Sequence, residues 1–132
     1  MGRRELREQV FKLLFRIEFN KQEDMPEQIQ LFFEDSEKTV SEKDETYIST
    51  KYANIVEKKV DIDAAINEIA EGWKTDRMGK VDLTILRLAV YEIRYDDDVP
   101  TSVAINEAVE IAKKFGQDGS PAFINGILAK FA

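Results

Sequence analysis

The sequence predicts an all-α protein of six or seven helices arranged as two packed helical bundles. Apolar residues recur at helical spacing along most of the 132 residues, and no segment shows a convincing strand alternation. The 43% hydrophobic and 34% charged residues are typical of a globular protein with a core. We therefore expect one domain over residues 1–132, with an N-terminal helical half at about 1–72 and a three-helix half at about 80–132.

The N-terminal half is predicted to contain four helical segments. These are a helix over about 3–19, a short segment opening at Pro26, a helix with the apolar stripe of 47–56, and a segment restarting after Asp61. Residues 34–45 carry no apolar stripe and are expected to form a solvated connection. Gly72 and Gly79 bracket the expected joint between the two halves.

The C-terminal half is predicted to contain three helices, at 82–95, 101–115 and 120–131. The stretches "DDDVP" and "GQDG" are the turns between them, and Gly116 is well placed to end the second helix. Ser120 as the cap and Pro121 in the first turn are typical of a helix start.

The last of these helices contains Asn125-Gly126, a pair that usually signals a turn. A glycine inside a helix costs about 1 kcal/mol relative to alanine, so the position calls for an explanation. We expect a neighbouring helix to cross closely at Gly126, with Asn125 hydrogen-bonding across or just beyond the contact. This crossing would aim Phe123 toward the N-terminal arginines. The alternative is a tolerated glycine on a solvent face.

In the segment 82–95 the polar face is predicted to consist of Thr84, Arg87, Tyr91 and Arg94. Arg87 is therefore expected at the surface or at its boundary. Glu92 instead projects among apolar neighbours, where an unpaired carboxylate would be costly. Since no second catalytic group accompanies it, a structural hydrogen bond or ion pair is favoured over an acid/base role.

The composition excludes several kinds of chemistry. The chain has no cysteine and no histidine, which removes disulfides, the usual zinc ligands and the nucleophilic triads. Asp96, Asp97 and Asp98 lack the spacing of a calcium loop, and Gly79-Lys80 lacks the rest of a P-loop. No secretory signal or membrane span is present, so we expect a cytoplasmic protein. Because histidine and cysteine are absent, we expect no catalytic residues, metal or cofactor. Binding is the stronger class of function.

Charge is unevenly distributed along the chain, whose net charge is −7. Residues 1–16 carry five basic and two acidic side chains, whereas residues 17–72 carry six basic and fifteen acidic ones. A basic end on an acidic protein indicates an anion-binding surface.

A second face of the first predicted helix combines basic and aromatic residues. It consists of Arg4, Arg7, Phe11 and Phe15, which follow the i, i+3, i+4 spacing. Guanidinium groups pair with phosphates and aromatic rings stack on unpaired bases, so such a strip suits single-stranded RNA. The alternative is that Phe11 and Phe15 widen the core stripe while the arginines are solvated.

Several motifs resemble the NusB family of bacterial transcription antitermination factors. They are "VDLTILRLAVYEI", "DVPTSVAINEAVEIAKKFG" and "SPAFINGIL", together with the opening "RRELREQVFKLLF". Trp73 and Arg77, as "W-x-x-x-R", look like the family's entry to its second bundle. The resemblance covers about residues 3–131 and is most specific from 81 to 128.

The resemblance implies a non-enzymatic RNA-binding protein. NusB proteins pair with NusE, a small-subunit ribosomal protein, and recognise the boxA element of nascent transcripts within a complex that keeps RNA polymerase elongating. By position, Arg3, Arg4 and Arg7 match the family's basic motif. Phe15 stands where many members have tyrosine, which keeps stacking without the phenolic hydrogen bond. Phe123 matches an aromatic position implicated in RNA contact.

Two other interpretations stay open at this point. Some ribosomal-RNA cytosine methyltransferases carry a NusB-like domain, and this chain could be such a domain without its catalytic part. It could also be a protein-binding helical scaffold that has lost its RNA.

Overall fold

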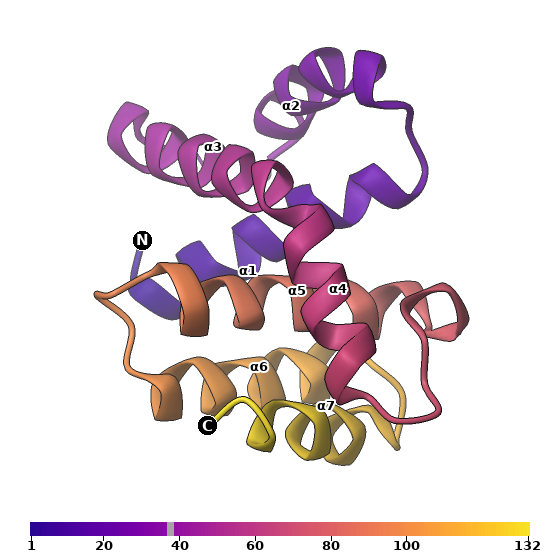
Figure 1. The fold of residues 1–132 in the computed structure, drawn as a ribbon. Coiled ribbons are helices and arrows are strands. Elements are labelled where there is room, and N and C mark those ends of the chain that lie inside the picture. The colour runs from indigo at the N-terminus through magenta and orange to yellow at the C-terminus, as the bar shows by residue number, and fades with distance from the viewer. Residues whose placement is uncertain (37–38) are drawn as a thin grey trace. The chain divides into compact units, whose positions relative to one another are not determined.

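The computed structural model describes residues 1–36 and 39–132, and within them it contains α-helices and short 3₁₀ turns but no strand (Figure 1). The α-helices are α1 (Arg3–Phe15), α2 (Met25–Glu34), α3 (Glu42–Glu57), α4 (Lys59–Ile69), α5 (Lys80–Tyr95), α6 (Thr101–Phe115) and α7 (Ser120–Ala129). The 3₁₀ turns are η1 (Arg16–Glu18), η2 (Gln22–Asp24) and η3 (Thr75–Arg77). The all-α prediction is confirmed. In the described part of the chain, no helix is both long and apolar enough to cross a membrane.

The chain divides into two compact units, Met1–Val56 (unit 1) and Glu57–Ala132 (unit 2). The joint expected at Gly72–Gly79 lies instead inside unit 2. The reason is that α4 packs against α5, so that it belongs with the C-terminal helices. The connection expected over 34–45 is shorter in the structure, because α2 continues to Glu34 and α3 begins at Glu42; its residues 37–38 lie outside the described part.

Unit 1 buries apolar side chains from α1, α2 and α3. These include Val10, Phe11, Leu13 and Leu14 of α1, Met25 and Phe32 of α2, and Ile48, Tyr52 and Ile55 of α3. Polar contacts also join its elements: the N-terminal ammonium of Met1 lies 3.1 Å from Asp44, and the Arg16 guanidinium lies over the Phe32 ring. Burial raises the pKa of the Tyr52 phenol above its usual 10.0.

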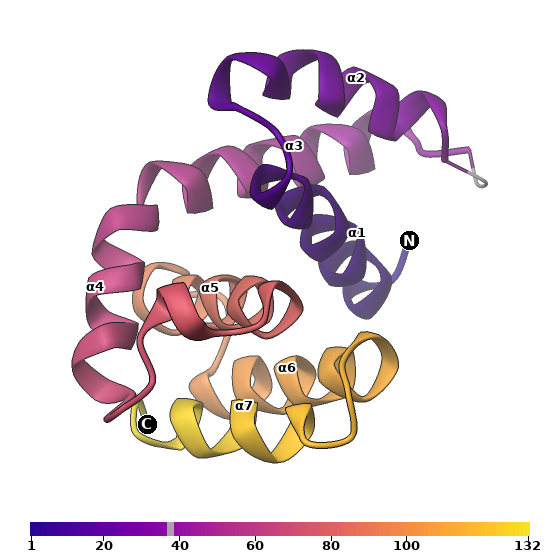
Figure 2. The same ribbon diagram turned by 90° about the vertical axis from the view of Figure 1, so that its right-hand side faces the viewer.

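Unit 2 is organised around α5. Residues 83–90 of this helix are all buried, and α4, α6 and α7 all pack against it. Figure 1 shows α5, α6 and α7 lying across the view in alternating directions, and Figures 1 and 2 both show α4 standing steeply to α5. At the exposed end of α5 the Arg94 guanidinium lies 5.2 Å from the Phe131 ring centroid, which holds the last residues of the chain against the bundle.

The prediction of a polar, solvent-facing side of α5 is wrong for two of its residues. Thr84 and Arg87 are 1% and 5% exposed, and each is satisfied locally. The Thr84 hydroxyl donates to the Lys80 carbonyl at 2.7 Å. The Arg87 guanidinium donates from Nε and Nη2 to the two carboxylate oxygens of Asp63, at 2.8 and 2.9 Å. The bidentate pair explains how a cation can lie inside the bundle, since a buried charge requires a matched partner.

Glu92 is more deeply buried than expected, at 1% exposed. Glu92 interacts with a neighbouring residue, and its structural role stays a prediction.

The close helix crossing expected at Gly126 is wrong. Gly126 and Asn125 are both exposed, and a Cβ added at Gly126 would meet nothing within 4 Å. The alternative, a glycine on a solvent face, is the correct one. The position that requires a glycine is Gly116, where a Cβ would lie 2.6 Å from the Ser120 Cβ and 2.8 Å from the Ala112 carbonyl oxygen.

Ser120 has a different role from the one its sequence position suggests. It begins α7 as predicted, but Gly119 occupies the cap position. The buried Ser120 hydroxyl instead accepts a hydrogen bond from the Gln117 N–H at 3.0 Å, which closes the turn between α6 and α7. The close approach of this serine is what excludes a side chain at Gly116.

Replacing Arg87 with leucine should lower the free energy of unfolding by about 3 kcal/mol, because Asp63 would keep a partly buried carboxylate without its bidentate partner. Chemical denaturation monitored by circular dichroism measures the change. The matched control is Lys113→Ala, which removes a 3.2 Å pair with Glu110 whose side chains are 59% and 36% exposed. That variant should cost less than about 1 kcal/mol. Equal costs for the two variants would contradict the assignment.

Gly126→Ala and Gly116→Ala should change stability in opposite directions. The first should raise the free energy of unfolding by about 0.5–1 kcal/mol, because alanine restricts the unfolded chain and meets no neighbour in the fold. The second should lower it by about 1–3 kcal/mol, because the added methyl group overlaps Ser120 and the Ala112 carbonyl. Melting temperatures of the two variants give the signs, and a stabilised Gly116→Ala protein would refute the packing account.

Candidate nucleic-acid interface

The start of α1 presents two exposed arginines, Arg3 and Arg4. The helix begins after Gly2, which makes no side-chain cap, so no side chain satisfies the first backbone N–H groups of this helix from the cap position. The positive end of the helix dipole thus lies at the same helix start as these two arginines. This arrangement is unfavourable for the helix alone, because cations are stabilising at the opposite end. It becomes favourable when a phosphate binds, since both the N–H groups and the arginines attract an anion.

The prediction of an open strip along α1 is wrong for Arg7 and Phe11. They are 8% and 3% exposed, so most of both side chains is buried. Phe11 thus follows the alternative interpretation of a wider core stripe. Arg7 contributes to the packing of unit 1, so any contact that it makes with a ligand uses a small part of its surface.

Three phenylalanines form a ladder at the other end of α1. The rings of Phe11 and Phe15 are stacked, with centroids 6.1 Å apart and planes 21° from parallel. Phe15 in turn meets Phe19 edge-to-face, at 5.0 Å and 73°. The ladder runs from a buried ring through a half-buried one to an exposed one, so Phe15 is held from both sides and keeps part of its surface open.

Phe123 lies on α7 in unit 2 and is half-buried. Its ring packs edge-to-face against Trp73, with centroids 5.7 Å apart and an interplanar angle of 75°. Trp73 itself is 55% exposed, so the pair forms an aromatic surface on unit 2. Because Phe123 and the N-terminal arginines belong to different units, the predicted aim of Phe123 toward the arginines stays a prediction.

The loop that carries Trp73 is well defined. Gly72 has a φ of +78°, which only glycine adopts readily, and it turns the chain after α4. The Asn67 side chain then accepts the Thr75 N–H at 2.8 Å. Sequence reasoning identified Trp73 only as a family landmark and missed its contact with Phe123. Fifty residues separate the two rings, and no periodicity links them.

Metal-ligand chemistry finds no support in the described residues 1–36 and 39–132, where no three acidic side chains are grouped as a site. The three aspartates after α5 form a turn, in which the Asp98 N–H donates to the Asp96 carboxylate at 3.1 Å. What the molecule does offer is a helix start without a side-chain cap, with two exposed arginines, and two sets of partly exposed aromatic rings.

Comparison with known proteins relates the whole chain to one family. The family model described as "NusB family" matches residues 4–132. A transcription antitermination protein NusB from Agathobacter rectalis is 52% identical over 132 residues, with 100% of both chains covered. Another, from Lachnoclostridium phytofermentans, is 50% identical over 130 residues, with 98% of each covered. These names favour the antitermination interpretation over the methyltransferase-domain and scaffold alternatives.

Among solved structures, NusB of T. maritima superposes with a TM-score of 0.87 at 38% identity, covering 100% of this chain and 91% of that one. The similarity therefore extends over the whole fold, including the N-terminal region where the sequence resemblance was weakest.

Proposed function

The chain belongs to the NusB family, and from this premise we propose that it acts in transcription antitermination by binding boxA-type single-stranded RNA together with NusE. The family consists of transcription factors rather than enzymes. Within the proposed function, Arg3, Arg4 and Arg7 bind phosphates while Phe15 and Phe123 stack on bases. The protein works in the cytoplasm within the antitermination complex of RNA polymerase, and it requires no cofactor.

The observation that carries the proposal is the coincidence of exposed arginines with the uncapped start of α1. Arg3 and Arg4 lie where the helix dipole disfavours a positive charge. A phosphate at this point would accept hydrogen bonds from the backbone and from a guanidinium group at once. Phe15, further along the same helix, offers a ring for a base of the same strand.

A second protein is part of the proposal for an electrostatic reason. The chain carries a net charge of −7, and Glu5 and Glu8 lie within its basic helix. Its own attraction for a polyanion is therefore weak. Two surfaces that share one RNA segment bind it more tightly than either alone, because the second contact becomes intramolecular.

Filter binding of a boxA RNA, with and without purified NusE, tests the proposed function directly. We expect weak retention by the protein alone and much tighter retention by the pair. The same RNA with its boxA sequence scrambled is the control for sequence preference. Failure of the pair to exceed NusE alone would overturn the proposal.

Replacing Arg3 with glutamine should weaken RNA binding without destabilising the protein. Each phosphate contact to a single strand contributes about 0.7 to the log–log salt slope, so the variant should lose about that much slope. The melting temperature should stay constant or rise, because removing a cation from a helix start is worth about 0.3–1 kcal/mol. Lys43→Gln, at an exposed position on α3, is the matched control for the loss of one positive charge. A full salt slope in the Arg3 variant would place the phosphate contact elsewhere.

Replacing Phe123 with alanine should reduce affinity in a different way. The loss of one stacked base costs about 1–3 kcal/mol, and the salt slope should remain that of the unmodified protein. Since Phe123 also contacts Trp73, circular dichroism must show that the variant is folded. Unchanged affinity in the folded variant would remove Phe123 from the RNA surface.

A further inference from the structure

Phe19 is an aromatic ring that the fold leaves at the surface. It is 60% exposed, more than any other large hydrophobic side chain of unit 1 in the described residues. Its ring meets Phe15 edge-to-face at 5.0 Å. Because most of its apolar surface remains in water, Phe19 contributes less to the hydrophobic stabilisation of unit 1 than a core phenylalanine does.

The backbone beneath Phe19 is fixed by polar contacts. The Phe19 N–H and the Asn20 side chain both donate to the Arg16 carbonyl, at 3.2 and 2.9 Å. The Arg16 guanidinium donates to the backbone and side-chain oxygens of Gln28, both at 3.2 Å, and lies 5.2 Å from the Phe32 ring centroid. The turn η1 is thus tied to α2, so the backbone that carries the exposed ring is fixed before any ligand arrives, and the ring itself rests against Phe15. A ring held in this way loses little conformational entropy on binding.

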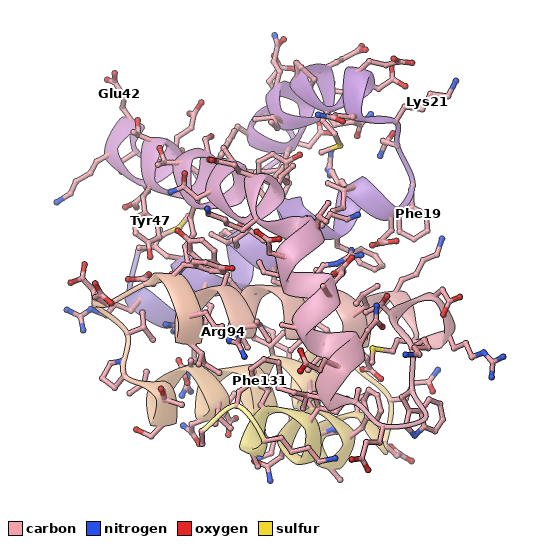
Figure 3. The ribbon with its side chains drawn as sticks, viewed as in Figure 1. Phe19, Lys21, Glu42, Tyr47, Arg94 and Phe131 are labelled. Atoms are coloured by element: carbon pink, nitrogen blue, oxygen red, sulfur yellow. The ribbon has the colours of Figure 1, made fainter. Side chains whose placement is uncertain are left out.

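Phe19 also continues a line of residues spaced four apart along α1 and η1. The line is Arg3, Arg7, Phe11, Phe15 and Phe19. Its first part is basic and its last part is aromatic, and successive members lie about one helical turn apart. Lys21 is exposed two residues beyond, and Figure 3 shows Phe19 and Lys21 on the same side of unit 1.

We propose that Phe19 is a further base-stacking residue of the RNA surface, which extends the bound strand by one nucleotide beyond Phe15, with Lys21 pairing the adjoining phosphate. The proposal rests on the RNA-binding function proposed above. A base fits this position because a single held ring flanked by a cation matches the two parts of a nucleotide.

A protein segment fits the same position less well. The residues around the ring in sequence, Glu18, Asn20 and Lys21, are polar, and the ring packs against the half-buried Phe15. Protein interfaces are anchored by well-packed clusters surrounded by contacts that exclude water. An exposed ring at the end of a short row of phenylalanines, with polar residues on both sides in sequence, is smaller than such a cluster.

Titration of a boxA RNA into the complex with NusE tests the proposal. Phe19→Ala should weaken binding about 5- to 150-fold, the range for one stacked base, and should leave the salt slope unchanged. Phe19→Trp should retain binding, because the larger ring also stacks. Lys21→Gln should instead reduce the salt slope by about 0.7.

Tyr47→Ala is the matched control. Tyr47 is an aromatic residue of α3 that is 44% exposed, and Figure 3 shows it on the opposite side of unit 1 from Phe19. This variant should bind RNA as the unmodified protein does. Circular dichroism should show that both alanine variants are folded.

Photo-crosslinking locates the contact independently of affinity. With 5-iodouridine placed at each position of the RNA in turn, the base that crosslinks to Phe19 should be the immediate neighbour of the base that crosslinks to Phe15. Unchanged affinity of Phe19→Ala, or a loss of NusE binding in place of RNA binding, overturns the inference and leaves the proposed function standing. Absence of RNA binding by the unmodified complex overturns both.

Discussion

The bidentate pair between Arg87 and Asp63 is the interaction on which the arrangement of unit 2 depends. Helix α5 is buried along eight consecutive residues, and a guanidinium in the middle of that stretch can be tolerated only opposite a carboxylate. Asp63 supplies both oxygens from α4, at 2.8 and 2.9 Å. The pair therefore fixes where α4 crosses α5, and the loop that follows α4 carries Trp73 to the edge of Phe123.

Arginines serve two distinct purposes in this molecule. Arg87 is paired with Asp63, and Arg16 donates to Gln28 and lies over the Phe32 ring, so both arginines join helices within their units. Arg3 and Arg4 are exposed instead, at a helix start whose dipole disfavours a positive charge. The same contrast holds for the glycines, since Gly116 is required by packing whereas the fold gives no reason for Gly126.

Much of the helical fold could be predicted from the sequence because helical periodicity and helix boundaries are local properties. The order of the helices and the start of α7 at Ser120 followed from them. Contacts between distant residues could not be predicted in this way. A projection of α5 placed Arg87 at the surface, because it contains no information about Asp63, 24 residues earlier in another helix. For the same reason the projection could not show that Gly126 lacks a neighbour, or that Phe123 meets Trp73. Within the candidate site, helical spacing predicted the strip that contains Arg4, and the family resemblance added Arg3, whereas the burial of Arg7 and Phe11 depends on tertiary packing.

Amide hydrogen exchange at the start of α1 is the measurement that tests the central claim most directly. The first amides of this helix, at residues 3–5, have no side-chain cap and should exchange rapidly in the free protein. If a phosphate of boxA RNA binds there, their exchange should slow markedly in the complex with NusE and RNA relative to the complex with NusE alone. The start of α6, which also lacks a side-chain cap, is the internal control and should not respond at residues 101–102. Unchanged exchange at residues 3–5 under conditions where the RNA is fully bound would contradict the account.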